Sequence, residues 1–308
     1  MPPTVPPDLA TLIGLSPSAA STLPIVAVAL AVAYATGAVR LWTTGRRWSP
    51  WRSASFLLGC AALWAISGLG VDDYGRVLLS VFMFQQLTLL MVVPALLVLG
   101  SPGTLLLRAT PHAGLGRTVL RISHAGLRSP VTRLLLQPWV TVPLYLLAFY
   151  GLYLAGWADI ALSMDAGHRV LEAAFLVIGI LLAAPVLSSD PLPVRMSHGA
   201  RALDVFIEAA LHAFFGVLMM MSGTVLVTSF AATTAGLGID PIADQQIAGG
   251  LAWSYGEAPT LLALLWIMHR WYTADTAASA AADRSEDRDG APELAAYNAY
   301  LKELDRET

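Results

Sequence analysis

The segment Val77–Leu99, with the sequence VLLSVFMFQQLTLLMVVPALLVL, carries no charged residue. An α-helix needs about 20 apolar residues to cross the hydrocarbon core of a bilayer, and this segment provides them. The whole chain has the same character, since 13% of its 308 residues are charged, 56% are hydrophobic and its mean hydropathy is +0.64. Soluble domains carry about 25% charged residues, and disordered chains combine low hydrophobicity with high charge. The composition therefore excludes both classes and indicates an integral membrane protein.

Six further apolar stretches on either side of this segment meet the same length criterion. The seven predicted spans are Pro24–Trp42, Trp51–Gly70, Val77–Leu99, Leu134–Trp157, Val170–Leu187, Leu203–Phe230 and Gly249–Trp271. The sequence thus predicts an all-α fold, a polytopic membrane helix bundle with seven transmembrane helices. We expect a short extracytoplasmic N-terminal segment (residues 1–23), a seven-helix membrane domain (residues 24–272) and a charged cytosolic tail (residues 273–308). In the tail, Leu294, Tyr297 and Leu301 fall at helical spacing, which leaves a short amphipathic helix and a solvated, partly frayed tail as alternatives.

The distribution of arginine predicts the orientation of the spans. Arginines gather in the first, third and fifth loops, at Arg46, Arg47, Arg52, Arg108, Arg117, Arg121, Arg128, Arg133, Arg195 and Arg201. The second, fourth and sixth loops carry aspartates, at Asp72, Asp73, Asp159, Asp165, Asp240 and Asp244. Because loops rich in Lys and Arg stay on the cytoplasmic side, we expect the N-terminus outside and the C-terminus in the cytosol. The residues before Pro24 include one acid and no base, so the first span is expected to be a retained helix rather than a cleaved signal peptide.

Ionisable residues within the predicted spans are candidates for function, because burying them in a bilayer is costly. His168 and Glu172 lie four residues apart at the outer start of the fifth span, and Glu208 and His212 have the same spacing in the sixth. Residues four apart share a helix face. Glu257 lies in the outer half of the seventh span. Each has a structural alternative: His168 as an interfacial residue, His212 as a hydrogen-bonding contact between helices, and Glu257 as a partner for backbone groups freed by the nearby proline.

Other polar or sulfur-containing residues give weaker signals. Gln85 and Gln86 are uncharged, and hydrogen bonding between helices is their default role. The run Met219–Met221 contains soft ligands, but consecutive helical positions point in different directions, so we interpret it as packing. The single cysteine, Cys60, excludes a disulfide framework within the chain and a thiolate cluster. The sequence has no Walker-type glycine loop, GxSxG or HExxH, and we do not expect an enzyme.

Several motifs together carry a family resemblance. They are PALLVLGSP at Pro94–Pro102, DPLPVR at Asp190–Arg195, HAFFG at His212–Gly216, DQQIAGGLAW at Asp244–Trp253, GEAP at Gly256–Pro259 and YNAYL at Tyr297–Leu301. The chain from Trp48 onward resembles the membrane-bound CtaG-like cytochrome c oxidase assembly family in its actinobacterial form. The resemblance implies a membrane accessory or assembly factor for a respiratory copper-containing cytochrome c oxidase, linked to copper delivery and located in the bacterial cytoplasmic membrane. The family-motif residues singled out as site candidates are Asp190, Asp244, Gln245, Gln246 and Glu257.

The chain departs from the family at the residues that would handle copper. The resemblance implies histidines four apart in the third helix and six apart in the fifth, but Phe82, Gln86 and Ala174 stand at three of these positions. Of the four outer histidines only His168 remains. Phenylalanine cannot bind a metal, and a glutamine amide is a poor ligand for soft copper. The candidate metal ligands are His168, His212, Glu172 and Met83, and we expect them to form an incomplete site, with copper as the cofactor in question.

Three functions remain open at this stage. The first is the assembly or accessory factor, the second a non-metal-binding scaffold or subunit-like partner of a respiratory complex, and the third a transporter of copper or a small solute. The membrane segments show no evident pair of matching halves of the kind many transporters have. We expect the lipid bilayer and respiratory oxidase subunits as partners, and no nucleic acid.

The entrance to the last predicted span has a small-residue pattern with structural consequences. Gly249 and Gly250 predict a close approach to a neighbouring helix. Asp244 and Gln245 precede them and are placed to cap the start of the helix.

Overall fold

The computed structural model describes residues 3–15, 22–194, 196–289 and 292–307, and these residues are almost entirely helical. Arg195, part of the fifth-loop motif, lies outside them. The chain divides into two compact units, Met1–Leu264 and Leu265–Thr308. The all-α prediction is confirmed for the described residues, where a single isolated bridge between Leu15 and Leu69 is the only β-type pairing.

The first unit contains the elements that position the candidate site. In chain order they are α1 (Leu9–Ile13), α2 (Leu23–Thr43), α3 (Pro50–Gly68), α4 (Gly70–Tyr74), α5 (Leu79–Leu87), the π-helical turn η1 (Thr88–Val92), α6 (Val93–Leu99), α7 (Pro102–Ala109), α8 (Leu115–Arg128), α9 (Pro130–Leu135), α10 (Pro138–Leu146), the π-helical segment η2 (Leu147–Leu154), α11 (Trp157–Leu162), α12 (Gly167–Leu187), α13 (His198–Met221), the 3₁₀ turn η3 (Thr228–Phe230), α14 (Ala231–Gly236) and α15 (Pro241–Ser254). The boundary between the units falls within α16 (Glu257–Asp289), and α17 (Pro292–Glu307) belongs to the second unit.

Four helical stretches are long and apolar enough to cross a membrane. They are Leu23–Thr43, Leu79–Ala109, Gly167–Leu187 and His198–Met221, and Pro138–Leu154 is a shorter apolar helix. These stretches overlap five of the seven predicted spans, and the total of seven stays a prediction. The opening segment Val77–Leu99 corresponds to α5, η1 and α6.

Three predicted spans differ from the helices that form. The fourth, expected as one helix over Leu134–Trp157, is divided among the end of α9, α10 with η2, and the start of α11. The sixth span was expected to reach Phe230, but α13 ends at Met221. The Ser222 hydroxyl donates to the Thr224 carbonyl at 2.9 Å, and such local hydrogen bonds compete with helix continuation. The seventh span, expected as one helix over Gly249–Trp271, is divided between α15 and α16 at Tyr255 and Gly256.

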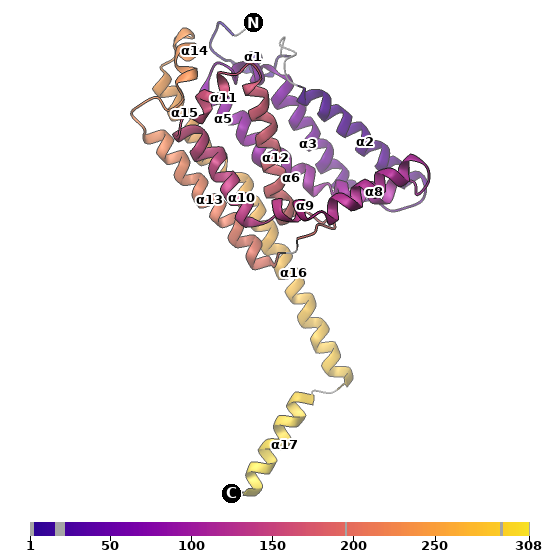
Figure 1. Cartoon of the computed structure of the whole chain (residues 1–308). Helices are drawn as coiled ribbons and strands as arrows, with labels where there is room; N and C mark the ends of the chain where they lie inside the picture. The colour runs from indigo at the N-terminus through magenta and orange to yellow at the C-terminus, as the bar shows by residue number, and fades with distance from the viewer. Residues whose placement is uncertain (1–2, 16–21, 195, 290–291, 308) are drawn as a thin grey trace. The chain divides into compact units, whose positions relative to one another are not determined.

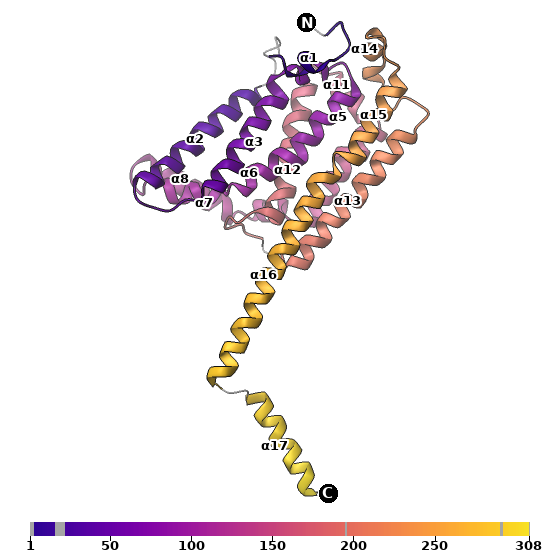
Figure 2. The same ribbon diagram turned by 180° about the vertical axis from the view of Figure 1, so that it is seen from behind.

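The long helices of the first unit run side by side (Figure 1). Figure 2 shows α2, α3, α6, α12 and α13 in turn across the bundle, and the best-packed pairs include α2 with α3, α3 with α6, and α13 with α15. The short helices α1, α11 and α14 gather at one end of the bundle, whereas α7, α8 and α9 gather at the other (Figure 1). Fully buried apolar side chains, among them Leu63, Phe82, Phe149, Phe175 and Phe215, form one continuous core between the helices.

A pair of glycines sets the distance between α13 and α15. A Cβ atom on Gly249 would lie 2.6 Å from the Met220 amide nitrogen, and one on Gly216 would lie 2.7 Å from the Trp253 amide nitrogen. Both distances are shorter than real Cβ contacts, so the two backbones touch only because neither position has a side chain. The predicted role of Gly249 agrees with this contact. The same expectation for Gly250 is wrong, since a Cβ there would meet nothing within 4 Å.

Three aspartates, which we call the remote capping aspartates (Asp159, Asp190 and Asp244), accept hydrogen bonds from the first amides of helices far away in sequence. Asp190 accepts from the Gly103 and Thr104 amides of α7 at 3.0 and 2.7 Å. Asp244 accepts from the Leu79 and Ser80 amides of α5 at 2.7 and 3.3 Å, and from the Ser80 hydroxyl. Asp159 accepts from the Thr228 and Ser229 amides at 3.1 and 2.7 Å. Each carboxylate satisfies amides that the helix cannot pair internally.

The predicted capping of α15 by Asp244 and Gln245 is therefore wrong. The N-cap of α15 is Asp240, whose side chain accepts from the Ala243 amide at 3.0 Å. Asp244 lies within the first turn of α15 and points to α5 instead. Gln245 accepts from the Leu226 amide at 2.7 Å and donates to the Thr224 carbonyl at 3.0 Å, so it holds the chain that follows α13.

Candidate functional site

Four buried polar side chains and the partly exposed Arg76 form a group, which we call the Asp72 cluster (Asp72, Arg76, Gln85, His168 and Glu172). They come from α4, from the turn after it, from α5 and from the start of α12. His168 Nε2 lies 3.3 Å from Glu172 Oε1 and 3.6 Å from Asp72 Oδ1. Arg76 Nη2 lies 3.1 Å from Asp72 Oδ2. Gln85 Nε2 donates to Glu172 Oε1 at 2.7 Å and to Asp72 Oδ1 at 3.2 Å, so its amide joins the two carboxylates.

Two glycines allow the surrounding backbone to approach the cluster. A Cβ atom on Gly70 would lie 1.9 Å from the Thr11 carbonyl oxygen, so only glycine lets α1 rest on the start of α4. A Cβ atom on Gly75 would lie 2.7 Å from Gln85 Oε1, so Gly75 leaves room for the amide of Gln85. The short helix α4 then directs Asp72 inward, with Arg76 one turn later on the same face.

The charges of the cluster balance within the chain. Asp72 and Glu172 are fully buried, and isolated carboxylates in such a position would be strongly destabilising. Burial raises the pKa of the Asp72 carboxyl, but its hydrogen bonds with His168 and Glu172 and the charge of Arg76 outweigh burial and hold that pKa below its usual value. Asp72 is therefore an ionised partner for the Arg76 guanidinium.

The cluster also contains a set of atoms with metal-binding potential. One imidazole nitrogen of His168 and one oxygen each from Asp72 and Glu172 lie within 4.8 Å of one another. One nitrogen and two carboxylate oxygens suit Zn²⁺ or Mn²⁺ better than Cu⁺, which prefers thiolate and thioether ligands. In the structure these oxygens already accept hydrogen bonds from Arg76 and Gln85, so a metal ion would have to displace partners from the chain.

A pocket of about 330 Å³ gives access to the cluster from the end of the bundle that holds α11 and η3. Arg76 and His168 form part of its wall, together with Leu162, Ser163, Met164, Asp165, Ser229 and Phe230. Asp159 holds the Ser229 side of this pocket in place, because its carboxylate accepts hydrogen bonds from the Thr228 and Ser229 amides. The pocket thus extends to the His168 side chain, whose two ring nitrogens are themselves buried.

Of the four predicted metal ligands, the structure brings two together. His168 and Glu172 belong to the cluster, whereas Met83 is a fully buried member of the apolar core. The His212 ring lies elsewhere, with its centroid 4.9 Å from that of Phe149 and 6.3 Å from that of Tyr145.

The residues that replace the expected histidines of the third helix close the space beside His168. The Phe82 ring is fully buried, with its centroid 5.4 Å from that of His168. Gln86 is also fully buried, and neither of its amide atoms has a hydrogen-bond partner among the described residues. An aromatic ring and an amide thus stand at the two positions of this helix where the resemblance implied histidines.

Sequence reasoning did not place Asp72, Arg76 and Gln85 in the site. Asp72 and Arg76 are four residues apart, which is a usable signal for an ion pair on a helix. No local signal connects Gln85 with Glu172, because the two residues meet only when α5 packs beside α12.

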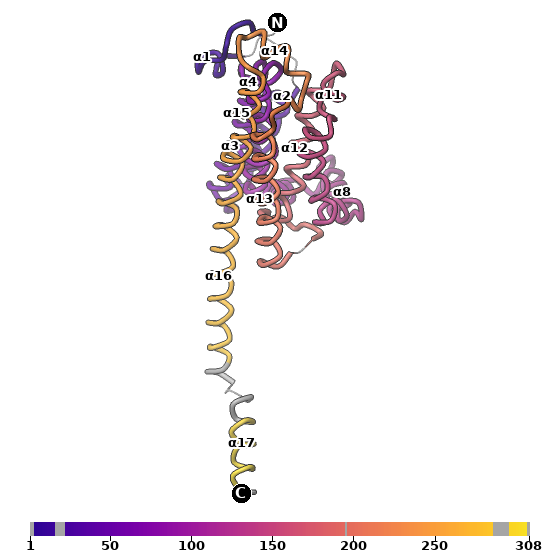
Figure 3. The backbone as a smooth tube through the Cα atoms, turned by 90° about the vertical axis from the view of Figure 1, so that its left-hand side faces the viewer, coloured from indigo at the N-terminus to yellow at the C-terminus, as the bar shows by residue number. Residues whose placement is uncertain are grey.

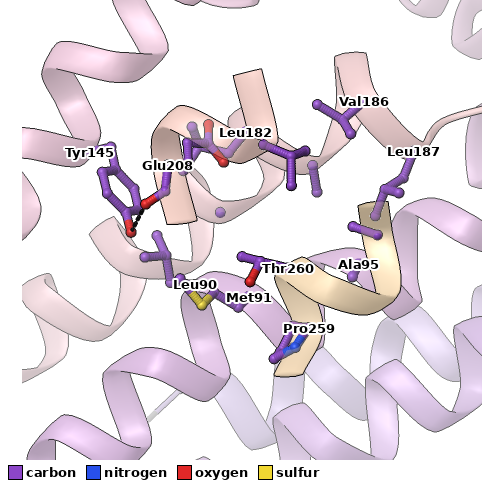
Figure 4. A pocket seen from close by; sticks show the side chains of 14 residues that line it. Leu90, Met91, Ala95, Tyr145, Leu182, Val186, Leu187, Glu208, Pro259 and Thr260 are labelled. Carbon is purple, nitrogen blue, oxygen red and sulfur yellow. Dashed lines mark hydrogen bonds between the residues drawn. The ribbon is translucent and has the colours of Figure 1, made fainter. Parts of the chain in front are cut away.

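A second polar location lies at a pocket lined mainly by apolar side chains of α12, α13, α16 and the η1–α6 region (Figure 4). Tyr145 donates to the Glu208 carbonyl at 3.2 Å, while Glu208 Oε1 has no hydrogen-bond partner among the described residues. Glu257, at the start of α16, accepts from the Thr260 hydroxyl at 3.4 Å. A Cβ atom on Gly256 would lie 1.9 Å from His212 Nε2 and 2.8 Å from the Ala252 carbonyl oxygen, so only glycine fits next to this imidazole.

The family-motif candidates have structural positions in the first unit. Asp190 and Asp244 are remote caps, Gln245 fixes the chain after α13, and Gln246 is exposed on α15. None of them contacts the Asp72 cluster through a hydrogen bond or ion pair recorded among the described residues.

Comparisons with known proteins identify one matching family and several relatives. A family model described as cytochrome c oxidase caa3 assembly factor (Caa3_CtaG) matches residues 32–274. Uncharacterized proteins of Mycobacterium bovis and Mycobacterium tuberculosis are 37% identical over 290 residues, and one of Mycobacterium leprae is 33% identical over 294 residues. In each case the alignment covers 93% of this chain and 44% of the relative, so the chain spans less than half the length of these proteins. No solved structure matches.

Proposed function

Because this chain belongs to the cytochrome c oxidase caa3 assembly factor family, we propose that it assists the assembly of a respiratory copper-containing cytochrome c oxidase as a membrane-embedded partner of oxidase subunits. The proposal places it in the bacterial cytoplasmic membrane with seven spans, an outer N-terminus and a cytosolic tail. The four apolar helical stretches support the membrane location, and the arginine-rich first, third and fifth loops support the orientation.

The observation that carries the partner role is the internal balance of the Asp72 cluster. Arg76 and His168 face Asp72 and Glu172, and Gln85 joins both carboxylates. These contacts tie α4, α5 and α12 together in the way that a bound cation would. In this role the cluster holds α4, α5 and α12 in a fixed arrangement for an oxidase subunit to recognise, and it does not release copper to that subunit.

The alternative of copper delivery rests on a different observation. The nitrogen and oxygen atoms of His168, Asp72 and Glu172 converge, and a pocket reaches His168. The set lacks sulfur and has one imidazole, so tight and selective Cu⁺ binding is not expected.

The proposal is tested by affinity purification from native membranes, with oxidase subunits scored by mass spectrometry. We expect oxidase subunits to co-purify with the wild-type chain and with an Arg169→Gln control, whose exposed arginine lies outside the cluster. Recovery of an unrelated transporter complex in place of oxidase subunits would contradict the assembly role. Copper uptake by proteoliposomes would instead support the transporter alternative.

Copper analysis after dialysis against a mild chelator separates the partner role from copper delivery. We expect the wild type to retain less than about one copper ion per chain, the count that one complete site would give. A Phe82→His, Gln86→His, Ala174→His triple variant, which restores the family pattern, should retain more. Stoichiometric copper in the wild type that is lost on His168→Ala would show that copper delivery is the better interpretation.

A further inference from the structure

The segment between Asp73 and Asp159 contains no acidic residue, although it includes α7, α8 and α9 and five of the arginines of the third predicted loop. A positive region of this length without internal carboxylates has to find its counter-charges elsewhere. The helices α7, α8 and α9 lie together at one end of the bundle (Figure 1), so this positive charge is gathered there.

The helix α8 separates apolar and basic residues onto different faces. Leu115, Val119 and Ile122 follow one another at helical spacing, and all three are exposed, Leu115 to 87%. A second face carries Arg117 and Arg121, again four residues apart, followed by His124 and Arg128. Only Leu120 is buried within α8. A short helix with an exposed apolar stripe opposite a basic stripe is typical of a helix lying in the plane of a bilayer interface.

Two arginines and a histidine meet at a pocket beside this helix. The wall of the pocket consists of His124, Leu127 and Arg128 of α8, Arg133 of α9, Leu107 of α7, and Pro191 and Pro193 of the following loop. The side chains of Arg128 and Arg133 have no hydrogen bond or ion pair within the described part of the chain. His124 Nδ1 lies 2.7 Å from the Leu120 carbonyl oxygen, which leaves Nε2 for another partner.

Neighbouring charged groups are already occupied. Asp190, which adjoins the pocket in sequence, has its carboxylate on the first amides of α7. Arg46 donates to the Arg108 carbonyl at 2.6 Å, and Arg108 lies over the Trp48 ring at 5.7 Å, so these two arginines hold the first loop against α7. Among the described residues, the guanidinium groups of Arg128 and Arg133 are therefore available positive charges at the pocket.

We propose that this pocket binds the phosphate headgroup of an anionic phospholipid, while the apolar stripe of α8 lies against the acyl chains. The two guanidinium groups supply the charge and the planar donors that a phosphate accepts. Leu107 and Leu127 provide an apolar wall below the headgroup. The site is separate from the Asp72 cluster, because α4, which carries Asp72, lies toward one end of the bundle and α8 lies toward the other (Figure 3).

The test titrates the purified full chain in neutral detergent with phosphatidylglycerol or phosphatidylcholine and measures bound lipid by native mass spectrometry. We expect tighter binding of phosphatidylglycerol, and an Arg128→Gln, Arg133→Gln double variant should weaken it about 30-fold, given the usual contribution of one basic side chain near an anionic surface. An Arg169→Gln, Arg284→Gln control removes the same charge elsewhere and should keep wild-type affinity.

Three results would overturn the assignment. They are an equal loss of phosphatidylglycerol in the control variant, equal affinity for phosphatidylcholine, and full displacement of the lipid by millimolar inorganic phosphate, which would identify a soluble anion as the ligand. An Ile122→Asn variant tests the apolar stripe independently. It should lower phosphatidylglycerol affinity while all arginines remain, and unchanged affinity would exclude the acyl-chain contact.

Discussion

At the scale of single residues, Asp72 and Arg76 show how the bundle tolerates charge. The Asp72 side chain is fully buried, and its carboxylate meets a guanidinium that is 30% exposed. Removing one member of a buried ion pair costs more than the pair contributes, because the other charge loses its partner.

We therefore expect Arg76→Gln to lower the free energy of unfolding by about 1–3 kcal/mol, a value reduced for the partial exposure of the arginine. The Asp72→Asn, Arg76→Gln double variant should lose less than the sum of the two single changes. Thermal unfolding in detergent measures the stability of the wild type, the two single variants and the double variant, with Arg169→Gln as the control. Additive losses would mean that the pair is not coupled.

The depressed pKa of Asp72 gives the cluster a defined pH dependence. A carboxyl whose pKa in the folded state lies below its unfolded value of about 3.8 stabilises the fold above that pH. This stabilisation is lost as pH falls toward the pKa of the folded state. The difference in melting temperature between wild type and Asp72→Asn should therefore shrink as the pH falls below about 4. A difference at pH 2 as large as that at pH 5 would show that the effect of Asp72 does not depend on its ionisation.

At the scale of helices, the remote capping aspartates determine where elements begin. Asp244 accepts hydrogen bonds from two amides and a hydroxyl of α5, whereas Asp240 accepts one from an amide of its own helix. We expect Asp244→Ala to cost about 2–3 kcal/mol and Asp240→Ala about 1 kcal/mol. Thermal unfolding ranks the two variants, and hydrogen exchange at Leu79 and Ser80 should quicken only in Asp244→Ala. The opposite ranking would show that α5 begins without this cap.

The contact between α13 and α15 gives a second prediction at this scale. Gly249→Leu must push the two backbones apart, since even a Cβ atom would overlap the Met220 amide. Gly250→Leu adds the same side chain one position later, where the space is open. We expect the folded yield in detergent to fall severalfold for Gly249→Leu and to stay near wild type for Gly250→Leu. Equal yields would argue against close packing at Gly249.

At the scale of the whole molecule, the orientation in the membrane can be measured directly. The arginine distribution predicts that a cysteine at Asp240 is reached by a membrane-impermeant maleimide from outside intact cells, and that one at Ser285 is protected. The native Cys60 is buried and can be replaced by alanine for this experiment. Labelling at Ser285 with protection at Asp240 would reverse the topology.

Features of the fold that depend on local sequence could be predicted from the sequence, whereas features that depend on contacts between distant residues could not. Runs of apolar residues such as Val77–Leu99 suffice to predict an all-α bundle, because the hydrophobic length criterion needs no tertiary information. The end of α13 at Met221 follows from a short turn, and the contact of Gly256 with the His212 imidazole follows from packing. A hydropathy pattern registers neither.

The candidate site was predictable only in part for the same reason. His168 and Glu172 share one helix, so their spacing revealed them. Asp72 and Gln85 join them from other helices, and which residues meet across helices is decided by packing. The distinction between Asp240 and Asp244 as caps likewise depends on where α5 lies.

The remote cap of α5 also has a consequence for the order of events during synthesis. Asp244 follows its partner Leu79 by 165 positions. At a translation rate of about 5–20 residues per second, Asp244 is synthesised about 8–30 s after the first turn of α5 that its carboxylate caps. Throughout this interval the nascent chain exposes unpaired amides at the edge of its third predicted span. Ribosome pausing before residue 244 therefore lengthens the time in which a membrane protease or an insertion chaperone can recognise the unfinished protein.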